Sequence, residues 1–337
     1  MIKNYSLKYI KPRKLVFFNS KINLKKDDVL IEVKSCGICG SDLKIYNGKN
    51  RRVKKNRVIG HEISGKIIKA PNNQKYFKSN SNIVLGADIE NKKNRDLALG
   101  HEIDGGFQKY LKINYKLLQK TPHFITKKKI DYDIASLAEP LACCLNGFEQ
   151  INFKPNFDVI IFGAGSIGQI IAKLCVYFKC RKVFLTDKNK FKLKKGIKNK
   201  KIIKINFGQL KKRINKNNQK DRIKFIFVAC SSLTAQNQAI DIAQNDTNIN
   251  FFAGLKQMNG KDPLLNINSN KIHYKQIKIV GSHGSRFRHL KMAGDLLINN
   301  KIKLGDIISH VFNIKDYKKA FQKLISGNSL KIIIKPN

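Results

Sequence analysis

Two kinds of hydrophobic pattern divide the chain. In residues 1–150, short apolar runs at 28–36, 63–70 and 81–87 are separated by clusters of Gly, Asn and Lys, and few apolar positions recur at a helical interval. Short runs bounded by such residues predict β-strands. We therefore expect this part of the chain to form a β-rich domain.

From Phe157 onward the pattern becomes one of alternating strands and helices. The stretch "FDVIIFGAGSIGQIIAKLCVYF" predicts a buried strand, a glycine turn and a helix with apolar positions at helical spacing. Further apolar strands are predicted at 182–187, 225–230, 248–254, 277–282, 308–314 and 330–335, and helices at 234–244 and 286–299. Strands that alternate with helices predict a parallel sheet covered on both faces.

Length and composition agree with a globular protein of two domains. The chain has 337 residues, which is too long for a single ordinary hydrophobic core. Hydrophobic residues make up 42% and charged residues 27%, so the chain has enough apolar side chains to bury a core.

The charge is strongly basic. A net charge of +44, from 67 Lys and Arg against 23 Asp and Glu, normally suggests a nucleic-acid or anionic membrane partner. The lysines are spread along the whole chain among abundant Ile and Asn, all encoded by AT-rich codons, so genome composition accounts for them. A basic nucleic-acid-binding protein stays an alternative, but we expect only weak, nonspecific binding at low salt and no specific nucleic-acid partner.

No segment predicts export or membrane insertion. The start, "MIKNYSLKYIKPRKLVFF", lacks the apolar core of a signal peptide, and the apolar segment 159–172 is broken by glycines and too short to span a bilayer. Seven cysteines without regular spacing do not form a disulfide framework. We therefore expect a cytoplasmic protein without a membrane partner.

The glycine turn matches the pattern G-x-G-x-x-G of dinucleotide-binding sites. It follows a predicted strand, opens a predicted helix, and the next strand ends in Asp187. The predicted cofactor-binding residues are Gly163, Gly165, Ser166, Ile167, Gly168 and Asp187. The Asp187 carboxylate would accept hydrogen bonds from the adenosine ribose and favours NAD over NADP, although Lys188 and Lys190 are near enough in sequence to reach a 2′-phosphate.

A second motif carries potential metal ligands. "CGICGSD" at 36–42 is followed by "GHE" at 60–62, and together they offer Cys36, Cys39, Asp42, His61 and Glu62. A redox couple usually opens a helix, whereas this pair ends a predicted strand, and a structural zinc knuckle requires a second cysteine pair nearby. A catalytic zinc site with three protein ligands fits better, and two buried thiols without a metal are the alternative.

These motifs together resemble those of the zinc-dependent medium-chain dehydrogenases/reductases, in the branch of the sorbitol (polyol) and threonine dehydrogenases. The matching pieces are "CGICGSD", "GHE", "GGFQKYLKI" at 105–113, "LAEPLACCLNG" at 137–147, "GAGSIG", "TD" at 186–187 and "IVGSHGS" at 279–285. The resemblance implies an α/β two-domain fold: a β-rich GroES-like catalytic domain of residues 1–150 and 285–337, and a Rossmann domain with a doubly wound parallel sheet of residues 151–284. It also implies a homodimer or homotetramer.

The resemblance implies which side chains hold the zinc. Cys39 is the first ligand, Cys36 is a structural neighbour, and His61 is the second ligand. Glu62 or Glu139 completes the site, directly or through a water. The alcohol branch of the family has a cysteine in that place, so Cys143 and Cys144 are alternatives to the carboxylates. Asp42 is expected to orient the His61 imidazole.

The chemistry of the family follows from the metal and the cofactor. Zinc as a Lewis acid lowers the pKa of a bound alcohol, whose carbon then transfers hydride to the nicotinamide. The Ser41 hydroxyl is expected to pass the proton outward. Many relatives finish this relay with a histidine where this chain has Lys44, so water or Glu139 is expected to take over.

Two further departures concern the zinc lobe and the substrate pocket. Residues 82–104 contain no cysteine where many relatives carry a four-cysteine structural zinc lobe, so we expect one zinc per chain. His101 and Glu102 in this shortened segment are expected to face solvent. In the family the pocket draws on the loop at 41–46, which includes Tyr46, and on the segment "HGSRFRH". Its arginines Arg286 and Arg288 could face an anionic substrate, but are expected to be solvated.

The sequence thus predicts an NAD-dependent dehydrogenase with one zinc that acts on a secondary hydroxyl or ketone of a polyol, sugar or sugar phosphate. A zinc-free quinone or enone reductase of the same superfamily is the closest rival. The presence of Cys39, His61 and Glu62 together argues against it.

Overall fold

The computed structural model describes residues 1–50, 52–72, 74–90, 97–216, 222–257 and 261–336. The chain divides into two compact units. The first joins residues 1–142 to residues 284–337, and the second comprises residues 143–283.

A seven-stranded, mostly antiparallel sheet forms the centre of the first unit. Its strands are β3 (Asp28–Ile38), β5 (Glu62–Lys69), β6 (Asn82–Leu85), β7 (Tyr110–Asn114), β8 (His123–Thr126), β15 (Ile308–Asn313) and β16 (Lys331–Lys335). The order is β15-β16-β3-β5-β6-β8, and β7 also pairs with β3. Strand β3 is buried along most of its length because it has neighbours at both edges. The metal motif therefore begins in the middle of a sheet.

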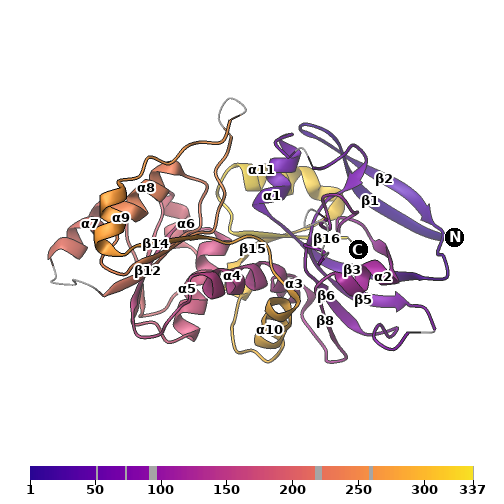
Figure 1. Ribbon diagram of the computed structural model, residues 1–337. Helices are drawn as coiled ribbons and strands as arrows, with labels where there is room; N and C mark the ends of the chain where they lie inside the picture. Colours follow the sequence, from indigo (N-terminus) through magenta and orange to yellow (C-terminus); the bar gives the residue numbers. More distant parts are fainter. Residues whose placement is uncertain (51, 73, 91–96, 217–221, 258–260, 337) are drawn as a thin grey trace. The chain divides into compact units, whose positions relative to one another are not determined.

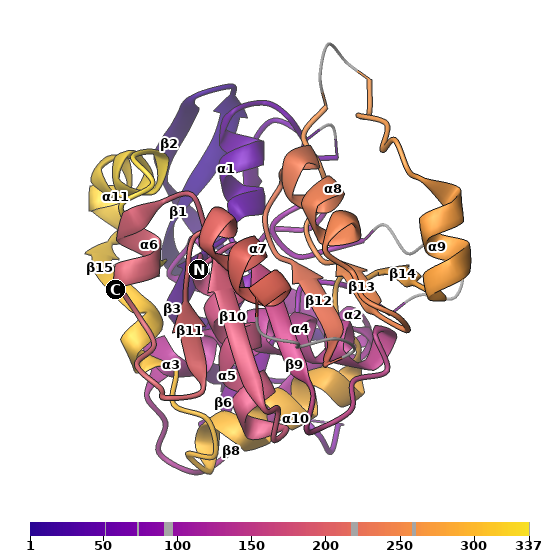
Figure 2. The same cartoon turned by 90° about the vertical axis from the view of Figure 1, so that its left-hand side faces the viewer.

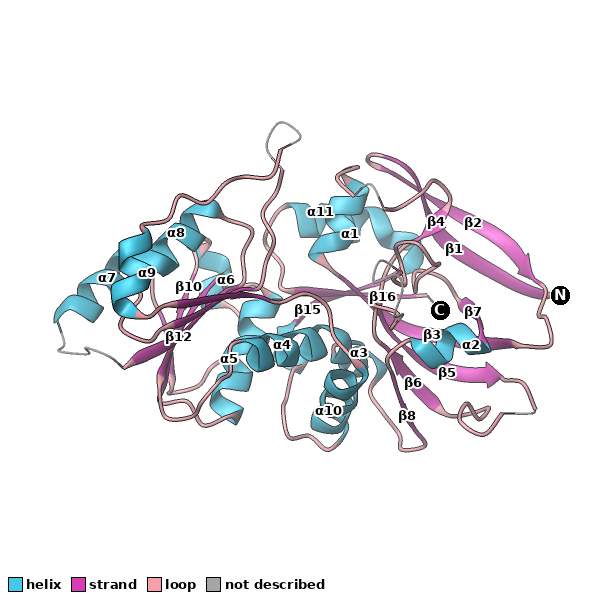
Figure 3. Ribbon diagram, in the orientation of Figure 1, coloured by secondary structure: helices cyan, strands magenta, loops and turns pink. Residues whose placement is uncertain are grey.

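A smaller sheet and several short helices complete this unit (Figure 3). The sheet has the order β2-β1-β4, with β1 (Ile2–Lys11), β2 (Lys14–Ile22) and β4 (Arg57–Val58). The helices are α1 (Gly40–Tyr46), α2 (Tyr115–Lys120), α3 (Tyr132–Ser136), α10 (Phe287–Ile298), α11 (Tyr317–Ile325), and the 3₁₀ turns η1 (Gly305–Ile307) and η2 (Ile314–Asp316). Helix α4 (Ala138–Gln150) runs from this unit into the second.

The helices of residues 1–150 correct the sequence prediction. The segment 41–46, expected as a loop, belongs to α1. Most of these helices are short and begin at a side-chain cap, as where Asn114 accepts a hydrogen bond from the backbone of Lys116 and Asp131 accepts two. A helix of one or two turns repeats its apolar positions too few times for the pattern to be recognised.

The second unit has a six-stranded parallel sheet. Its strands are β9 (Asp158–Phe162), β10 (Lys182–Thr186), β11 (Ile202–Lys204), β12 (Ile223–Val228), β13 (Asn248–Phe251) and β14 (Lys278–Gly281). They lie side by side in the order β11-β10-β9-β12-β13-β14 (Figure 2). From β9 the next two strands in sequence are added toward one edge of the sheet, and β12, β13 and β14 are added toward the other edge. Doubly wound sheets bind nucleotides at the point between β9 and β12 where the order of the strands changes direction in this way.

Helices cover both faces of this sheet, with α5 (Ser166–Tyr177) on one face and α8 (Leu233–Asp241) on the other (Figure 1). The other helices are α6 (Lys190–Lys194), α7 (Phe207–Lys216) and α9 (Ser269–Lys275). All five residues of β9 are buried, as expected for a strand covered on both sides.

The predicted fold class is confirmed: a β-rich unit accompanies a doubly wound parallel sheet. The helix expected at 286–299 and the strands expected at 308–314 and 330–335 correspond to α10, β15 and β16. In the part of the chain that the structure describes, no helix combines the length and the apolar character needed to cross a membrane.

Candidate active site

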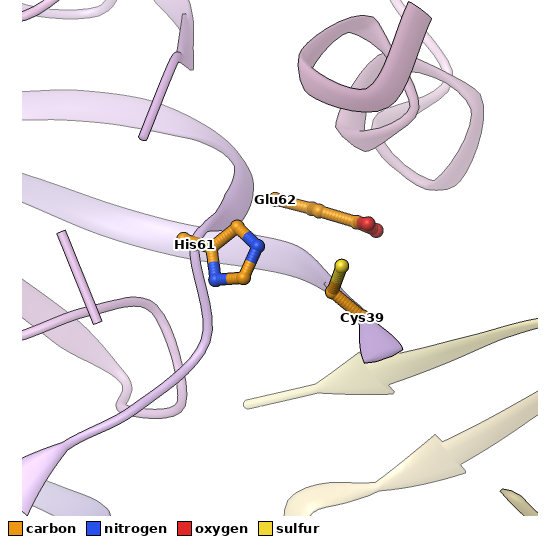
Figure 4. Close-up of side chains that lie close together, drawn as sticks. All are labelled: Cys39, His61 and Glu62. Atoms are coloured by element: carbon orange, nitrogen blue, oxygen red, sulfur yellow. The ribbon is translucent and has the colours of Figure 1, made fainter. Parts of the chain in front are cut away.

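Three potential metal ligands converge in the first unit. The Cys39 sulfur, a ring nitrogen of His61 and a carboxylate oxygen of Glu62 all lie within 4.8 Å of one another, and the side chains point toward a common space (Figure 4). Tetrahedral zinc places thiolate, imidazole and carboxylate donors roughly 3.2–3.8 Å apart. The donor types and their spacing therefore fit a zinc ion after small side-chain movements.

Strand pairing brings the two motifs together. Strand β3 ends at Ile38, and Cys39 is the N-cap of α1, which begins at the next residue. Strand β5 begins at Glu62 and pairs with β3 in a register that sets Glu62 opposite Gly37. The end of one strand thus meets the start of its antiparallel neighbour.

Asp42 ties the two ligand segments to each other. Its Oδ2 accepts a hydrogen bond from the backbone N–H of Cys39 at 2.8 Å, and its Oδ1 accepts one from that of Gly60 at 3.1 Å. The residue is fully buried, and burial raises the pKa of its carboxyl. Its Oδ1 lies 3.9 Å from Nδ1 of His61, which is beyond hydrogen-bonding distance.

The His61 ring is buried between polar groups. Its Nε2 lies 3.4 Å from the Ser41 hydroxyl, and among the described residues its Nδ1 has no hydrogen-bond partner. Burial alone lowers the pKa of His61, but the carboxylate of Asp42, the neighbouring Cys39 side chain and the charge of Glu139 outweigh it and raise this pKa well above its usual value. The surroundings of His61 therefore favour positive charge at this position.

Cys36 differs from Cys39 in its environment. It lies in β3, is fully buried and packs in the core of the first unit. Burial, followed by the negative charges of Asp42 and Glu62, raises the pKa of the Cys36 thiol well above its usual value. A cysteine in such a place remains a thiol, whereas zinc binds the thiolate.

Glu62 is fully buried and paired with a lysine that the sequence did not indicate. The Nζ of Lys331 donates hydrogen bonds to Oε1 and Oε2 of Glu62 at 2.5 and 2.7 Å, and to the carbonyl of Ile38 at 3.2 Å. A Cβ atom on Gly37 would come within 1.9 Å of the Glu62 carboxylate, so only glycine leaves room for it.

The other candidates for the third ligand lie on α4. Glu139 is buried in the first turn of that helix, and its charge contributes to the raised pKa values of His61 and Lys331. Cys144 is buried, and it influences the pKa of Cys175, which also lies in the second unit. Cys143 is partly buried. Among the described residues, the group of converging ligand atoms includes none of these three side chains.

The expectation that His101 and Glu102 face solvent is wrong. Both are partly buried, and the ring centroids of His101 and His61 lie 5.5 Å apart. Burial and the charge of His61 lower the pKa of His101 to about 4. Residues 91–96 of the shortened lobe lie outside the described residues.

The glycine turn has the geometry of a phosphate-binding loop. Gly163 has a φ of +104°, and a Cβ on Gly168 would lie 1.7 Å from the Gly163 carbonyl, so the first and third glycines are required by the turn and by close packing. A Cβ on Gly165 would meet no atom within 4 Å, so the space beside the second glycine is open. Ser166 and Ile167 begin α5 at this point.

Asp187 follows β10 beside this turn. Its Oδ2 accepts a hydrogen bond from the backbone N–H of Ala164, and its Oδ1 accepts one from that of Asn189, both at 2.8 Å. Lys188 and Lys190 are exposed. Asp187 is thus fixed next to the glycine turn while the two lysines extend into solvent.

The remaining candidate pocket residues lie away from the converging ligands or are exposed. The Tyr46 ring packs on Phe321 of α11, with centroids 5.0 Å apart, as part of the core. Arg286 and Arg288 are both exposed, at the start of α10. Lys44 is partly buried in the last turn of α1.

Comparisons with known proteins find similarity to dehydrogenases in sequence and in fold. The family model of the alcohol dehydrogenase GroES-like domain matches residues 25–123. D-arabinitol dehydrogenase 1 of Uromyces fabae is 26% identical, covering 98% of this chain and 97% of that protein. D-arabitol-phosphate dehydrogenase of Enterococcus avium is 24% identical, covering 92% and 90%. Among solved structures, an alcohol dehydrogenase of Thermotoga maritima matches with a TM-score of 0.86 at 18% identity, covering 100% of both chains.

Proposed function

We propose that this chain, which is similar to alcohol dehydrogenases in its GroES-like domain and to polyol dehydrogenases over nearly its whole length, is an NAD-linked zinc dehydrogenase of the medium-chain family that interconverts a secondary hydroxyl and the corresponding ketone. The observation that carries the proposal is the convergence of Cys39, His61 and Glu62 in a chain that also has a complete dinucleotide-binding turn. The substrate class is a polyol, sugar or sugar phosphate, which the similarity to D-arabinitol and D-arabitol-phosphate dehydrogenases supports.

Cys39, His61 and one carboxylate would hold the zinc. The position of Glu62 supports it as the direct ligand, and Glu139 is the alternative, directly or through a water. His61 would bind through Nε2, because Nδ1 lies on the side of Asp42, whose carboxylate would accept the Nδ1–H once the two groups move closer than their present 3.9 Å. When bound, zinc supplies Lewis acidity that lowers the pKa of the substrate hydroxyl.

Ser41 is the group next to the metal ligands that can hold the substrate proton. Its hydroxyl lies 3.4 Å from His61 Nε2 and is only partly buried, so it can accept a proton on one side and pass one to water on the other. Lys44, on the same helix, is a cation at the usual exit of the family relay and cannot accept a proton while charged. We infer that water or Glu139 completes the transfer.

The cofactor would bind along the glycine turn of the second unit. The backbone N–H groups at the start of α5 would donate to the pyrophosphate beside Gly165, and Asp187 would accept hydrogen bonds from the adenosine ribose hydroxyls. NAD is proposed over NADP because the Asp187 carboxylate repels a 2′-phosphate. When bound, the cofactor would supply the nicotinamide as hydride acceptor.

Domain assignment, assembly and compartment complete the proposal. We assign residues 1–150 and 285–337 to the catalytic domain and residues 151–284 to the nucleotide domain, and we propose a homodimer or homotetramer. We also propose a reducing compartment such as the cytoplasm, because seven cysteines without regular spacing do not form a disulfide framework.

The test is NAD reduction by the purified protein against a panel of polyols, sugar phosphates and amino alcohols, with metal content measured on the same sample. We expect turnover of at least one polyol-type substrate by protein that contains one zinc per chain, and loss of turnover after chelation. Reduction of quinones or enones by metal-free protein, without oxidation of any alcohol, would instead support the zinc-free reductase. A sequence-dependent gel shift at physiological salt would support the nucleic-acid-binding alternative.

A further inference from the structure

The segment at residues 97–106 is fixed against residues 58–60, which directly precede His61. The Gly105 and Gly106 N–H groups donate to the carbonyls of Val58 and Gly60, at 2.8 and 2.7 Å. A Cβ on Gly105 would come within 2.0 Å of the Gly60 carbonyl, and one on Gly100 within 2.8 Å. The position of the segment relative to His61 is therefore set by direct backbone contact.

An ion pair between Arg52 and Glu102 holds the middle of this segment in place. Arg52 donates from Nε and Nη2 to the two carboxylate oxygens of Glu102, at 2.6 and 3.0 Å, and Glu102 also accepts a hydrogen bond from the Ala98 N–H at 3.0 Å. Such a two-point contact between guanidinium and carboxylate fixes orientation as well as distance. His101, the neighbour of Glu102, is thereby held in place.

Hydrogen bonds determine which ring nitrogen of His101 carries the proton. The backbone N–H of Arg52 donates to Oδ1 of Asn50 at 3.0 Å, which identifies that atom as the amide oxygen. The other amide atom, Nδ2, therefore donates to Nδ1 of His101 at 3.2 Å. A neutral imidazole that accepts at Nδ1 has its hydrogen on Nε2.

We propose that His101 is a specificity-determining residue whose Nε2–H donates a hydrogen bond to a substrate hydroxyl next to the reacting carbon, so that the enzyme selects vicinal diols over isolated alcohols. The inference rests on the proposed function of the Cys39 and His61 site. His101 lies 5.5 Å from His61, centroid to centroid, so a group adjacent to the reacting one is within its reach. A fixed donor left without its acceptor discriminates strongly against an analogue that lacks the hydroxyl.

The same hydrogen bonds argue against His101 as a general base. Its acceptor nitrogen is already occupied by Asn50, and its other nitrogen carries a hydrogen. His101 therefore does not replace the relay histidine that many relatives have at the position of Lys44. It contributes recognition rather than proton transfer.

The test compares the polyol turned over fastest with its analogue lacking the hydroxyl next to the reacting carbon. We expect His101→Phe to lower kcat/KM for the polyol roughly ten- to hundredfold while leaving that for the deoxy analogue nearly unchanged. The exposed His273 of α9 supplies the control, since His273→Phe is expected to change neither value. Zinc content is measured on each variant and is expected to be unchanged.

A second measurement does not depend on turnover. The ¹⁵N chemical shifts of the His101 ring, measured in the metal-free protein and assigned by comparison with His101→Phe, are expected to show hydrogen on Nε2. Hydrogen on Nδ1, or an equal loss of kcat/KM for both substrates, would overturn the role of His101 alone. Failure of the unmodified protein to oxidise any alcohol would overturn the proposed function and this inference with it.

Discussion

Lys331 reaches Glu62 across Gly37, from one neighbour of β3 to the other. Its ammonium group donates to both carboxylate oxygens, at 2.5 and 2.7 Å, and the two side chains are 2% and 0% exposed. Burial alone lowers the pKa of Lys331, but the Glu62 carboxylate outweighs this and raises it above the usual value. The candidate metal site therefore has a fixed positive charge beside one of its carboxylates.

Lys331→Met removes this ammonium group and leaves Glu62 buried without a counter-charge. Breaking a buried pair in this way costs about 3–5 kcal/mol, so we expect a loss of that size in the unfolding free energy of the metal-free first unit. Zinc binding is expected to reduce the loss, because the metal replaces the missing positive charge. Denaturant unfolding with and without zinc measures both effects.

The control for this variant is the double variant Lys331→Met, Glu62→Gln. Removing both charges is expected to restore most of the lost stability. If the double variant is as unstable as the single one, Lys331 contributes through packing alone.

Cys39→Ala is expected to abolish zinc binding and reduce turnover to background without unfolding the protein. The chain has separate hydrophobic cores in its two units, so the fold does not depend on the metal as it does in a small zinc domain. Metal analysis and circular dichroism on the same preparation measure the two outcomes. The unmodified protein is expected to contain one zinc per chain.

Cys36→Ala is the matched control for that experiment. The Cys36 thiol packs in the core, so its removal is expected to lower stability modestly and to retain zinc and much of the activity. Two zinc ions per chain, or loss of metal from both cysteine variants alike, would contradict the assignment.

Asp187→Ser tests the choice of cofactor. The unmodified protein is expected to bind NAD at least about tenfold more tightly than NADP, a difference of ~1.4 kcal/mol, because the carboxylate repels the 2′-phosphate. The serine removes this repulsion, and Lys188 and Lys190 nearby then favour the phosphate. Titration of intrinsic tyrosine fluorescence with each nucleotide measures the ratio, and equal affinities in the unmodified protein would refute the role of Asp187.

His123 predicts a pH dependence of stability in the first unit. Its ring lies between Phe77 and Phe287, at centroid distances of 4.9 and 5.2 Å, and burial lowers its pKa. The unfolded chain binds the proton more readily, with a pKa of about 6.5. The contribution of neutral His123 to the unfolding free energy is therefore complete above a pH of about 6.5 and is lost as the pH falls below it.

His123→Phe is expected to remove this contribution to the pH dependence while keeping an aromatic ring in the same place. Urea midpoints of the two proteins, measured at about pH 7.5 and about pH 5.0, give the comparison. A midpoint that falls equally in both proteins would show that other groups account for the whole effect.

The motifs that depend on local sequence were predictable. The glycine turn could be recognised because each of its glycines meets a local need, such as the positive φ of Gly163 and the close packing of Gly168. The positions of β9 and α5 follow from the apolar pattern on either side of it. Cys39 and His61 could be named as candidate ligands because their motifs resemble those of a known dehydrogenase family, and the structure brings both side chains together with Glu62. Strand β11 was missed because three residues carry too little pattern.

The polar contacts around the site depend on pairings between distant segments. Lys331 begins an apolar strand, and in the local sequence it cannot be told apart from a lysine that faces solvent. Its burial results from the pairing of β16 with β3 and of β3 with β5. His101 is partly buried because Arg52 holds Glu102, a contact between residues 50 positions apart. Nothing in the local sequence of either segment indicates its partner.

The division of the first unit into two segments has a consequence for synthesis on the ribosome. Residues 143–283 emerge after Cys39, His61 and Glu62 but before β16, so the growing chain carries all three side chains while Lys331 is still missing. During that interval the chain lacks the ammonium group that pairs with the Glu62 carboxylate in the folded protein. Since burying an unpaired carboxylate is costly, Glu62 reaches its final buried state only after β16 has been synthesised.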